Sequence, residues 1–216
     1  SGQVAKAPLR DTLKHHWREV LIAAGLKVVE TAPFYIFSTF VVSYATSTLT
    51  YQKSQALEAV TLGALVATVM IPLMGLLSDK IGRQRMYAAS VFMLGLFIVP
   101  WFMLLNTGTT WGIVLATVIA FGVLWAPVTA VLGTLCSEIF SANVRYTGIT
   151  LGYQLGAALA GGTAPLIATG LLAKYDGDWV PVAWYLAVTV AISLIAIFCA
   201  SRVKRASLLQ AQPEHL

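Results

Sequence analysis

The stretch Gly75-Leu-Leu-Ser-Asp79-Lys-Ile-Gly82-Arg83-Gln-Arg85 is a short polar loop between two apolar segments, each long enough to cross a membrane. Gly75 allows two helices to approach closely, Asp79 can accept hydrogen bonds from a helix start, and Gly82 permits a tight turn. Arg83 and Arg85 favour the cytoplasmic side of a membrane. A basic loop that only sets topology would explain the arginines, but it would not explain the glycines and the aspartate.

The composition is that of an integral membrane protein. Hydrophobic residues make up 58% of the 216 residues and charged residues only 11%, whereas about 25% of a soluble domain is charged. Because a membrane helix needs ~20 residues, the length predicts an all-α membrane protein with six transmembrane helices. The apolar segments lie at residues 20–46, 56–77, 86–105, 111–136, 147–173 and 179–201.

The third and sixth segments are nearly uniform apolar runs. Their few polar groups, such as Ser90, Thr189 and Ser193, can bond within their own helix. Segments of this kind can face lipid, so each half of the chain is expected to end in an outer helix.

The basic residues fall mainly on one side of the membrane. Eleven of the 14 lysines and arginines lie before the first segment or after the second, fourth and sixth. By the positive-inside rule both termini are cytoplasmic, in a multi-pass protein of the inner or plasma membrane, and no nucleic-acid partner is implied. The sequence therefore divides into a cytoplasmic linker (1–19), a six-helix transmembrane domain (20–201) and a cytoplasmic tail (202–216).

The linker contains an amphipathic pattern over residues 9–19. Leu9 and Leu13 recur at helical spacing, while basic residues mark another face. This pattern predicts a short helix lying on the cytoplasmic leaflet, with Asp11 or Thr12 as its cap. A disordered linker is the alternative.

Lys27 and Glu30 are charged residues inside the first apolar segment. Counted at ~1.5 Å per residue from Val20, they lie ~10 and ~15 Å into a hydrocarbon core ~30 Å thick. Each would cost ~2.5–3.5 kcal/mol in lipid, and their spacing of three residues lets them pair on one helix face. The pair either ties this helix to its neighbours or lines a cavity that binds a substrate or a proton.

Proline interrupts two of the segments near aromatic side chains. Pro33 removes the hydrogen bond to the carbonyl of Val29, which predicts a kink beside the charged pair, and Tyr35 supplies aromatic surface there. In the fourth segment Pro127 likewise frees a carbonyl, and the indole N–H of Trp125 needs a partner. Each segment either lines a cavity or is a kinked helix with packed aromatic side chains.

In the fifth segment small residues recur at four-residue intervals: Gly148, Gly152, Gly156 and Ala160. Such a ridge predicts close packing between helices. Tyr153 and Gln154 lie beside this ridge, and both either line a cavity or bond to a neighbouring helix.

A second polar loop, Ser137-Glu138-Ile-Phe-Ser-Ala-Asn-Val-Arg145-Tyr-Thr-Gly148, follows the fourth segment. Glu138 and Arg145 lie on the same side of the membrane as Asp79 and Arg83, so the four side chains are expected to form one cytoplasmic cluster. The alternative is a scattered set of surface ion pairs, which would contribute little to stability.

Both loops resemble those of the Major Facilitator Superfamily of transporters. The first is similar to the signature Gly-x-x-x-Asp-x-x-Gly-Arg followed by basic residues, and the second to a Glu–(x6)–Arg loop in which Ser141 replaces the usual proline. The resemblance implies half of the family fold, with six helices built as two three-helix repeats. It also implies that a set of loop residues latches the two halves of a transporter together. These residues are Gly75, Asp79, Gly82, Arg83, Glu138 and Arg145.

The amphipathic segment resembles the linker between two such halves, which implies a C-terminal half whose N-terminal six-helix half is missing. The run from His16 to Phe37 and the sequence Val-Arg-Tyr-Thr-Gly at 144–148 are similar to the metabolite:proton symporter family. This resemblance implies proton-coupled symport of a small organic acid or zwitterionic metabolite by alternating access within the lipid bilayer. The candidate residues for binding substrate or proton are Lys27, Glu30, Tyr35, Trp125, Tyr153 and Gln154.

Two other classes of protein remain as alternatives. One is a facilitator without proton coupling, and the other is a six-helix channel or membrane scaffold, which explains the topology but not the two loops. The sequence has no His/Cys/Asp spacing typical of a metal site and no Ser–His–Asp set. We therefore expect no enzyme activity, no cofactor and no metal.

Overall fold

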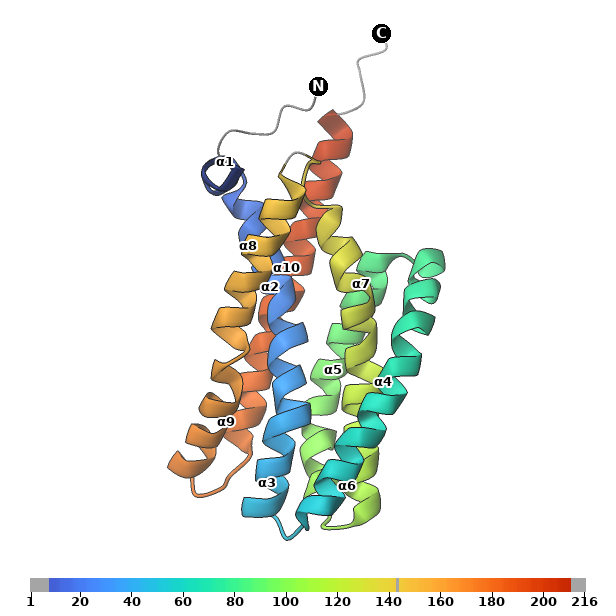
Figure 1. Cartoon of the computed structure of the whole chain (residues 1–216), viewed down its shortest axis with the longest axis vertical. Coiled ribbons are helices and arrows are strands. Elements are labelled where there is room, and N and C mark those ends of the chain that lie inside the picture. The colour runs from blue at the N-terminus through green and yellow to red at the C-terminus, as the bar shows by residue number, and fades with distance from the viewer. Residues whose placement is uncertain (1–7, 143, 211–216) are drawn as a thin grey trace.

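The computed structural model describes residues 8–142 and 144–210, and these residues form helices without a strand. Six helical stretches are long and apolar enough to cross a membrane. Figure 1 shows that the short first helix, α1 (Pro8–His15), and the end of the last helix, α10 (Val180–Gln210), lie at the same end of the bundle. The predicted all-α membrane fold with six spans is confirmed. The parts of the predicted linker and tail at residues 1–7 and 211–216 lie outside the described residues.

The six spans are α2–η1–α3, α4, α5, α6–η2–α7, α8–α9 and α10. Their bounds are α2 Trp17–Tyr35, η1 Ile36–Phe40, α3 Val41–Ser47, α4 Lys53–Ile81, α5 Arg83–Leu105, α6 Thr110–Thr117, η2 Val118–Trp125, α7 Ala126–Ser137, α8 Arg145–Ala160, α9 Thr163–Lys174 and α10 Val180–Gln210.

Two of the spans contain π-helical segments next to their prolines. The segment η1 begins three residues after Pro33, and η2 ends two residues before Pro127. Because proline lacks a backbone N–H, it breaks the regular α-helical hydrogen-bond pattern, and here the helix widens locally beside the break. Such π-helical turns often occur at functional sites.

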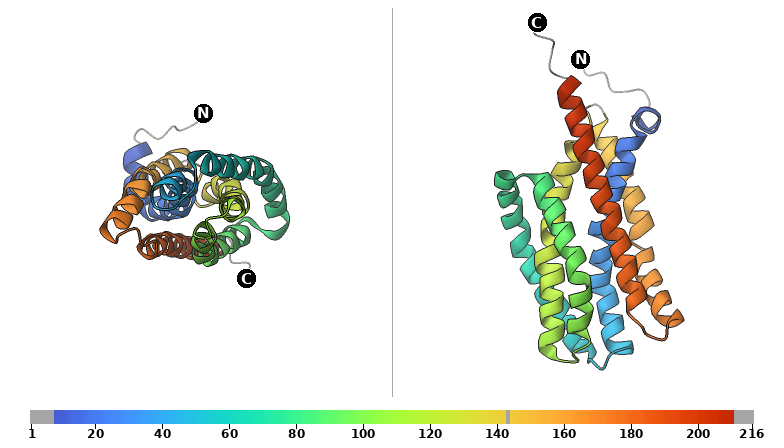
Figure 2. Two further views of the ribbon diagram at one scale, coloured as in Figure 1. Left: turned by 90° about the horizontal axis from the view of Figure 1, so that it is seen from below. Right: turned by 180° about the vertical axis from the view of Figure 1, so that it is seen from behind.

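The first span of each three-helix group packs into the other group. Thus α2 of the first span packs mainly against α8 and α10, and η2 and α7 of the fourth span pack mainly against α4 and α5. Figure 2 shows α5 and α10 side by side along one side of the bundle, where these two spans also pack together. Because each group packs against the other in this way, the six spans form one unit.

The ridge of small residues on α8 lies against α2. A Cβ atom on Gly152 would lie 2.6 Å from the Cβ of Ala23, and one on Gly156 would lie 2.7 Å from the carbonyl oxygen of Ala24. These separations are shorter than real Cβ contacts, so glycine is required for the approach. The ridge is confirmed as a helix-packing feature.

Side chains from two other helices bind the backbone of α2. Ser193 of α10 donates to the carbonyl of Gly25 at 2.7 Å and accepts from the N–H of Val29 at 3.1 Å. Tyr87 of α5 donates to the carbonyl of Leu26 at 2.7 Å. The sequence suggested that Ser193 can bond within its own helix, but its hydroxyl instead lies between a donor and an acceptor of one α2 turn.

The third and sixth spans are not the least covered. Only 11% of the most apolar window of the second span is buried, compared with 33% for the third span and 44% for the sixth. A plain apolar sequence shows that a helix tolerates lipid, but it does not show which helices its own chain leaves uncovered.

The amphipathic segment forms α1, Pro8–His15, and its side chains Leu9 and Leu13 are exposed. The helix begins before Asp11 and Thr12, so neither residue caps it. At the other end of the chain the predicted tail from residue 202 begins inside α10 rather than after it.

Candidate functional site

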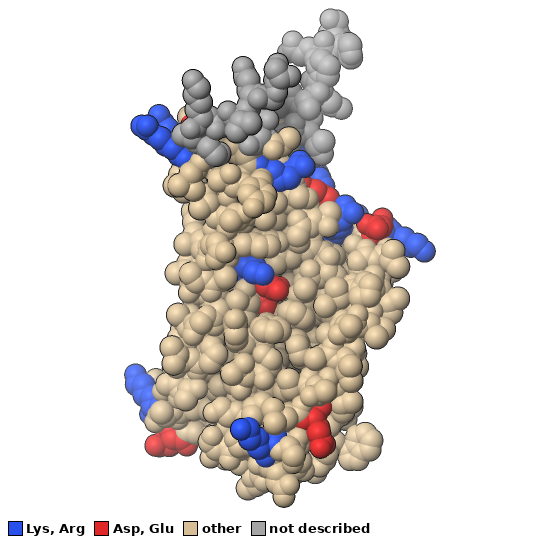
Figure 3. All heavy atoms as spheres, in the orientation of Figure 1, with Lys and Arg blue, Asp and Glu red and all other residues tan. Residues whose placement is uncertain are grey.

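Lys27 and Glu30 form an ion pair halfway along the first span. Nζ of Lys27 lies 2.5 Å from Oε2 of Glu30, and the two side chains are 19% and 15% exposed. Figure 3 shows a blue and a red group side by side at mid-height, while the other charged groups in this view lie toward the two ends of the molecule. The pair is therefore mostly covered by protein but still reachable from one face of this chain.

The carboxylate of Glu30 also receives hydrogen bonds from two hydroxyl groups. Thr31 donates to Oε2 at 3.1 Å, and Thr129 of α7 donates to Oε1 at 3.3 Å. The indole N–H of Trp125 donates to the backbone carbonyl of Glu30 at 2.7 Å. The partner that Trp125 requires is thus the α2 backbone, and two spans meet at Glu30.

Lys27 lies against α8. Its Nζ is 4.8 Å from the centre of the Tyr153 ring, a cation–π geometry that stabilises a partly desolvated ammonium. A Cβ on Gly156 would lie 2.8 Å from the Cβ of Lys27. The missing side chain at Gly156 therefore makes room for the lysine stem.

Four aromatic side chains form a cluster around Phe34, one turn beyond Glu30. The ring of Phe34 lies 5.2 Å from Trp125, 5.7 Å from Phe121 and 5.4 Å from Tyr35. Trp125 and Phe121 are buried, whereas Tyr35 is 36% exposed. The sequence pattern indicated Trp125 and Tyr35. Phe121 belongs to the same cluster because η2 packs against α2, which the sequence did not show.

Gln154 differs from the other candidates because it is exposed on α8. Within the described residues its side chain has no hydrogen-bond partner, so it does not link two helices of this chain. Of the six candidate side chains, Lys27, Glu30, Trp125 and Tyr153 are in direct contact as a group, and Tyr35 joins them through Phe34.

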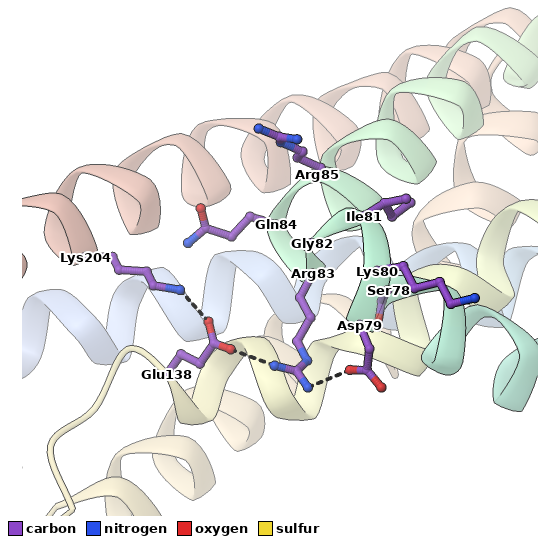
Figure 4. A pocket seen from close by; sticks show the side chains of 10 residues that line it. All are labelled: Ser78, Asp79, Lys80, Ile81, Gly82, Arg83, Gln84, Arg85, Glu138 and Lys204. Atoms are coloured by element: carbon purple, nitrogen blue, oxygen red, sulfur yellow. Dashed lines mark hydrogen bonds and ion pairs between the residues drawn. The ribbon is translucent and has the colours of Figure 1, made fainter.

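A second charged site lies at the end of the bundle that carries α1. Arg83 bridges two carboxylates, with Nη2 2.8 Å from Oδ1 of Asp79 and Nη1 3.0 Å from Oε1 of Glu138. Lys204 of α10 lies 2.9 Å from the other Glu138 oxygen. Figure 4 shows these four side chains, here called the charged cluster, along the edge of a cavity of about 560 Å³.

Arg145 does not join the charged cluster. Its Nε donates instead to the carbonyl of Phe140 at 3.4 Å, within its own loop. Lys204 occupies the cationic position that the sequence assigned to Arg145. The only sequence signal for Lys204 was its place in a basic run after the last span, and that run was explained by topology alone.

The glycines of the first loop have different roles. Gly82 has φ +98° and its N–H donates to the carbonyl of Ser78 at 2.9 Å, so it forms the tight turn between α4 and α5. A Cβ on Gly75 would meet no atom within 4 Å, so none of the described helices approaches there. Asp79 does not cap α5 either, because its carboxylate accepts from Arg83.

The charge state of Glu138 is set by its neighbours. Burial raises the pKa of its carboxyl, but hydrogen bonds and positive charge from Lys204 and Arg83 outweigh burial and leave the pKa below its ordinary value. A carboxylate with a lowered pKa stabilises the folded contacts above the ordinary pKa, and this contribution is lost as pH falls through the lowered pKa.

Comparison with known proteins agrees with these features. A family model described as the Major Facilitator Superfamily matches residues 24–215. The chain belongs to the Major Facilitator Superfamily. Among its relatives, the ectoine/proline transporter ProP of Corynebacterium glutamicum is 29% identical over 210 residues, which cover 97% of this chain and 41% of that protein.

Two further relatives are named for different solutes. The shikimate transporter of Escherichia coli is 27% identical over 201 residues, covering 93% of this chain and 46% of that protein. The citrate-proton symporter of Klebsiella pneumoniae is 24% identical over 185 residues, covering 86% and 41%. This chain thus spans less than half the length of these curated relatives, which are transporters rather than enzymes. No solved structure was found to match the chain.

The indole hydrogen bond of Trp125 gives a testable prediction. Trp125→Phe keeps an aromatic ring near Phe34 but leaves the Glu30 carbonyl without its 2.7 Å partner. We expect the free energy of unfolding to fall by ~1–3 kcal/mol, measured as a lower thermal midpoint of the purified protein in detergent. Trp111→Phe is the control, because Trp111 is 77% exposed. Equal midpoints for the two variants would contradict the prediction.

Proposed function

We propose that this chain is the C-terminal half of a proton-coupled symporter for a small organic acid or a zwitterionic metabolite, of the metabolite:proton symporter family. The observation that carries the proposal is the Lys27–Glu30 pair, which lies in mid-span with both charges compensated. An ionisable pair at this depth indicates a solute or proton pathway more often than a purely structural bridge. The relatives include a citrate-proton symporter, a shikimate transporter and an ectoine/proline transporter.

The geometry suggests how solute and proton binding are coupled. A carboxylate of the solute competes with Glu30 for the ammonium of Lys27, whose stem is held by Tyr153 and Gly156. Glu30 then keeps its bonds from Thr31 and Thr129 but loses its cation. A carboxylate without a cation in low-dielectric surroundings favours the protonated form, so solute binding and proton uptake occur at one shared pair.

The half-transporter assignment is supported by the surfaces that this chain leaves open. The second span is the least covered, and Gly75 on that span has open space beside it. A second six-helix half packed against α4 would cover both. We place both termini on the cytoplasmic side of the inner or plasma membrane, where the charged cluster would act as the latch that closes this end during alternating access.

Uptake by the complete transporter tests this proposal. We expect a labelled solute to accumulate against its gradient in cells or proteoliposomes, and a protonophore to abolish the accumulation. The solutes to compare are proline, ectoine, shikimate and citrate. Equilibration without accumulation would favour an uncoupled facilitator, and single-channel conductance would favour a channel, so either result would contradict symport.

A further inference from the structure

The last turns of α10 extend beyond the transmembrane part of the bundle. The helix has 31 residues, so at ~1.5 Å per residue it is ~46 Å long and exceeds a hydrocarbon core ~30 Å thick. Figure 1 shows this end of α10 protruding past the other spans, on the side that carries α1. Lys204 lies six residues before the end of α10.

This part of α10 contacts two other elements at the charged cluster. Nζ of Lys204 lies 2.9 Å from one oxygen of Glu138, while Nη1 of Arg83 lies 3.0 Å from the other oxygen. Three residues earlier in α10, Ser201 donates to Oε1 of Gln84 at 3.2 Å. The helix is therefore bound both to the start of α5 and to the carboxylate that follows α7.

The two cations together restrict the Glu138 carboxylate. Each oxygen accepts from a different cation, so rotation of the group breaks at least one charge-assisted hydrogen bond. Arg83 also donates from Nη2 to Oδ1 of Asp79 of α4 at 2.8 Å. Four helical elements, α4, α5, α7 and α10, are thus joined through three ion pairs.

We propose that Lys204 is a positioning residue of the charged cluster. It holds the Glu138 carboxylate in the orientation in which Arg83 bridges Glu138 and Asp79. Through this contact the protruding end of α10 takes part in closing the transporter. The inference rests on the proposed alternating-access function and extends it, because it adds the C-terminal helix to a latch otherwise built from two loops.

The electrostatic surroundings of Glu138 provide a readout. Glu138 borders two depressions, and the other charged or titratable groups that line them are Arg83, Lys204, Asp79, Lys80, Arg85, His16 and Glu19. Removal of Lys204 leaves burial, which raises the pKa of Glu138, opposed by Arg83 alone. The contact with Arg83 is then lost at a higher pH than in the wild type.

The test is Lys204→Gln in the complete transporter. We expect the maximal uptake rate to fall about two- to fivefold, the range that an exposed ion pair supports, while KM is unchanged because the substrate site is distant. The acidic limb of the rate, measured against pH on the side facing Glu138, should move to higher pH. Lys204→Arg keeps the cation and should restore both values.

Arg205→Gln is the matched control. It removes the same charge from the same helix, and Arg205 is exposed and makes no hydrogen bond or ion pair with a described side chain. Identical rates and pH profiles for Lys204→Gln and Arg205→Gln would overturn the inference. If Lys204→Gln does not fold, Glu138→Gln replaces it and should give the same fall in rate, and a wild-type rate for Glu138→Gln would likewise overturn the inference.

Failure of the Lys204 test can be distinguished from failure of the proposed symport. Absence of proton-driven accumulation in the wild type contradicts symport but leaves solute counterflow measurable. The same comparison of Lys204→Gln with Arg205→Gln is then made on counterflow, where a difference supports the positioning role and equality overturns it.

Discussion

Glu30→Gln in the complete transporter is expected to lower proton-driven uptake by about tenfold or more and to remove its dependence on pH, while membrane insertion stays intact. A tenfold loss corresponds to ~1.4 kcal/mol, which is modest for a group that accepts from Lys27, Thr31 and Thr129. The amide keeps the size of the side chain and can still accept from the hydroxyls, but it cannot bind the coupled proton. Initial uptake rates measured from acidic to alkaline pH provide the test.

A double variant separates coupling from folding. Lys27→Met alone leaves a carboxylate without its cation and should lower the thermal midpoint, whereas Lys27→Met combined with Glu30→Gln removes both charges and should largely restore it. Proton-coupled uptake should stay absent in the double variant. If Lys27→Ala and Glu30→Gln each retain solute affinity and proton dependence, the pair has only a structural role.

Gly156→Leu is expected to have the largest effect on folding. A Cβ at this position would lie 2.7 Å from the carbonyl oxygen of Ala24 and 2.8 Å from the Cβ of Lys27, so α8 and α2 must separate. Overpacking of this kind costs ~1–3 kcal/mol or more, and we expect the thermal midpoint to fall by about 5–10 °C. Gly156→Ala should give a smaller loss of the same sign.

Gly170 is the matched control within the same span. A Cβ on Gly170 of α9 would meet no atom within 4 Å, so Gly170→Ala relieves the backbone entropy of glycine without a clash. Its thermal midpoint should be equal to or above that of the wild type. Equal midpoints for Gly156→Ala and Gly170→Ala would show that the tight contact with α2 is not required.

The features predicted correctly from the sequence depend on short-range geometry. The length of each apolar segment and the spacing of basic loops determine the number of spans, and the three-residue interval between Lys27 and Glu30 places both on one helix face. The left-handed backbone at Gly82 and the small-residue ridge of α8 follow from the residue types themselves. Each feature is local to one apolar segment or to one loop of the chain.

The corrected features depend on which helices meet. Lys204 rather than Arg145 reaches Glu138, and Ser193 bonds to α2 rather than to its own helix. Gly75 lies beside open space, and Asp79 pairs with Arg83 instead of capping a helix. None of these outcomes could be predicted from the chain order, because each depends on which residue of another helix lies opposite.

The sequence by itself determined that this protein is a six-span membrane helix bundle with one charged pair buried in its first span, since lipid excludes charge and unpaired backbone at every position alike. Only the tertiary structure decided which groups compensate that pair. Trp125 and Thr129 reach Glu30 from residues 95 and 99 positions away, and Tyr153 reaches Lys27 from another span. The physical reason is that helical periodicity is local, whereas the rotation of each helix and the side chains it meets are set by packing against all its neighbours.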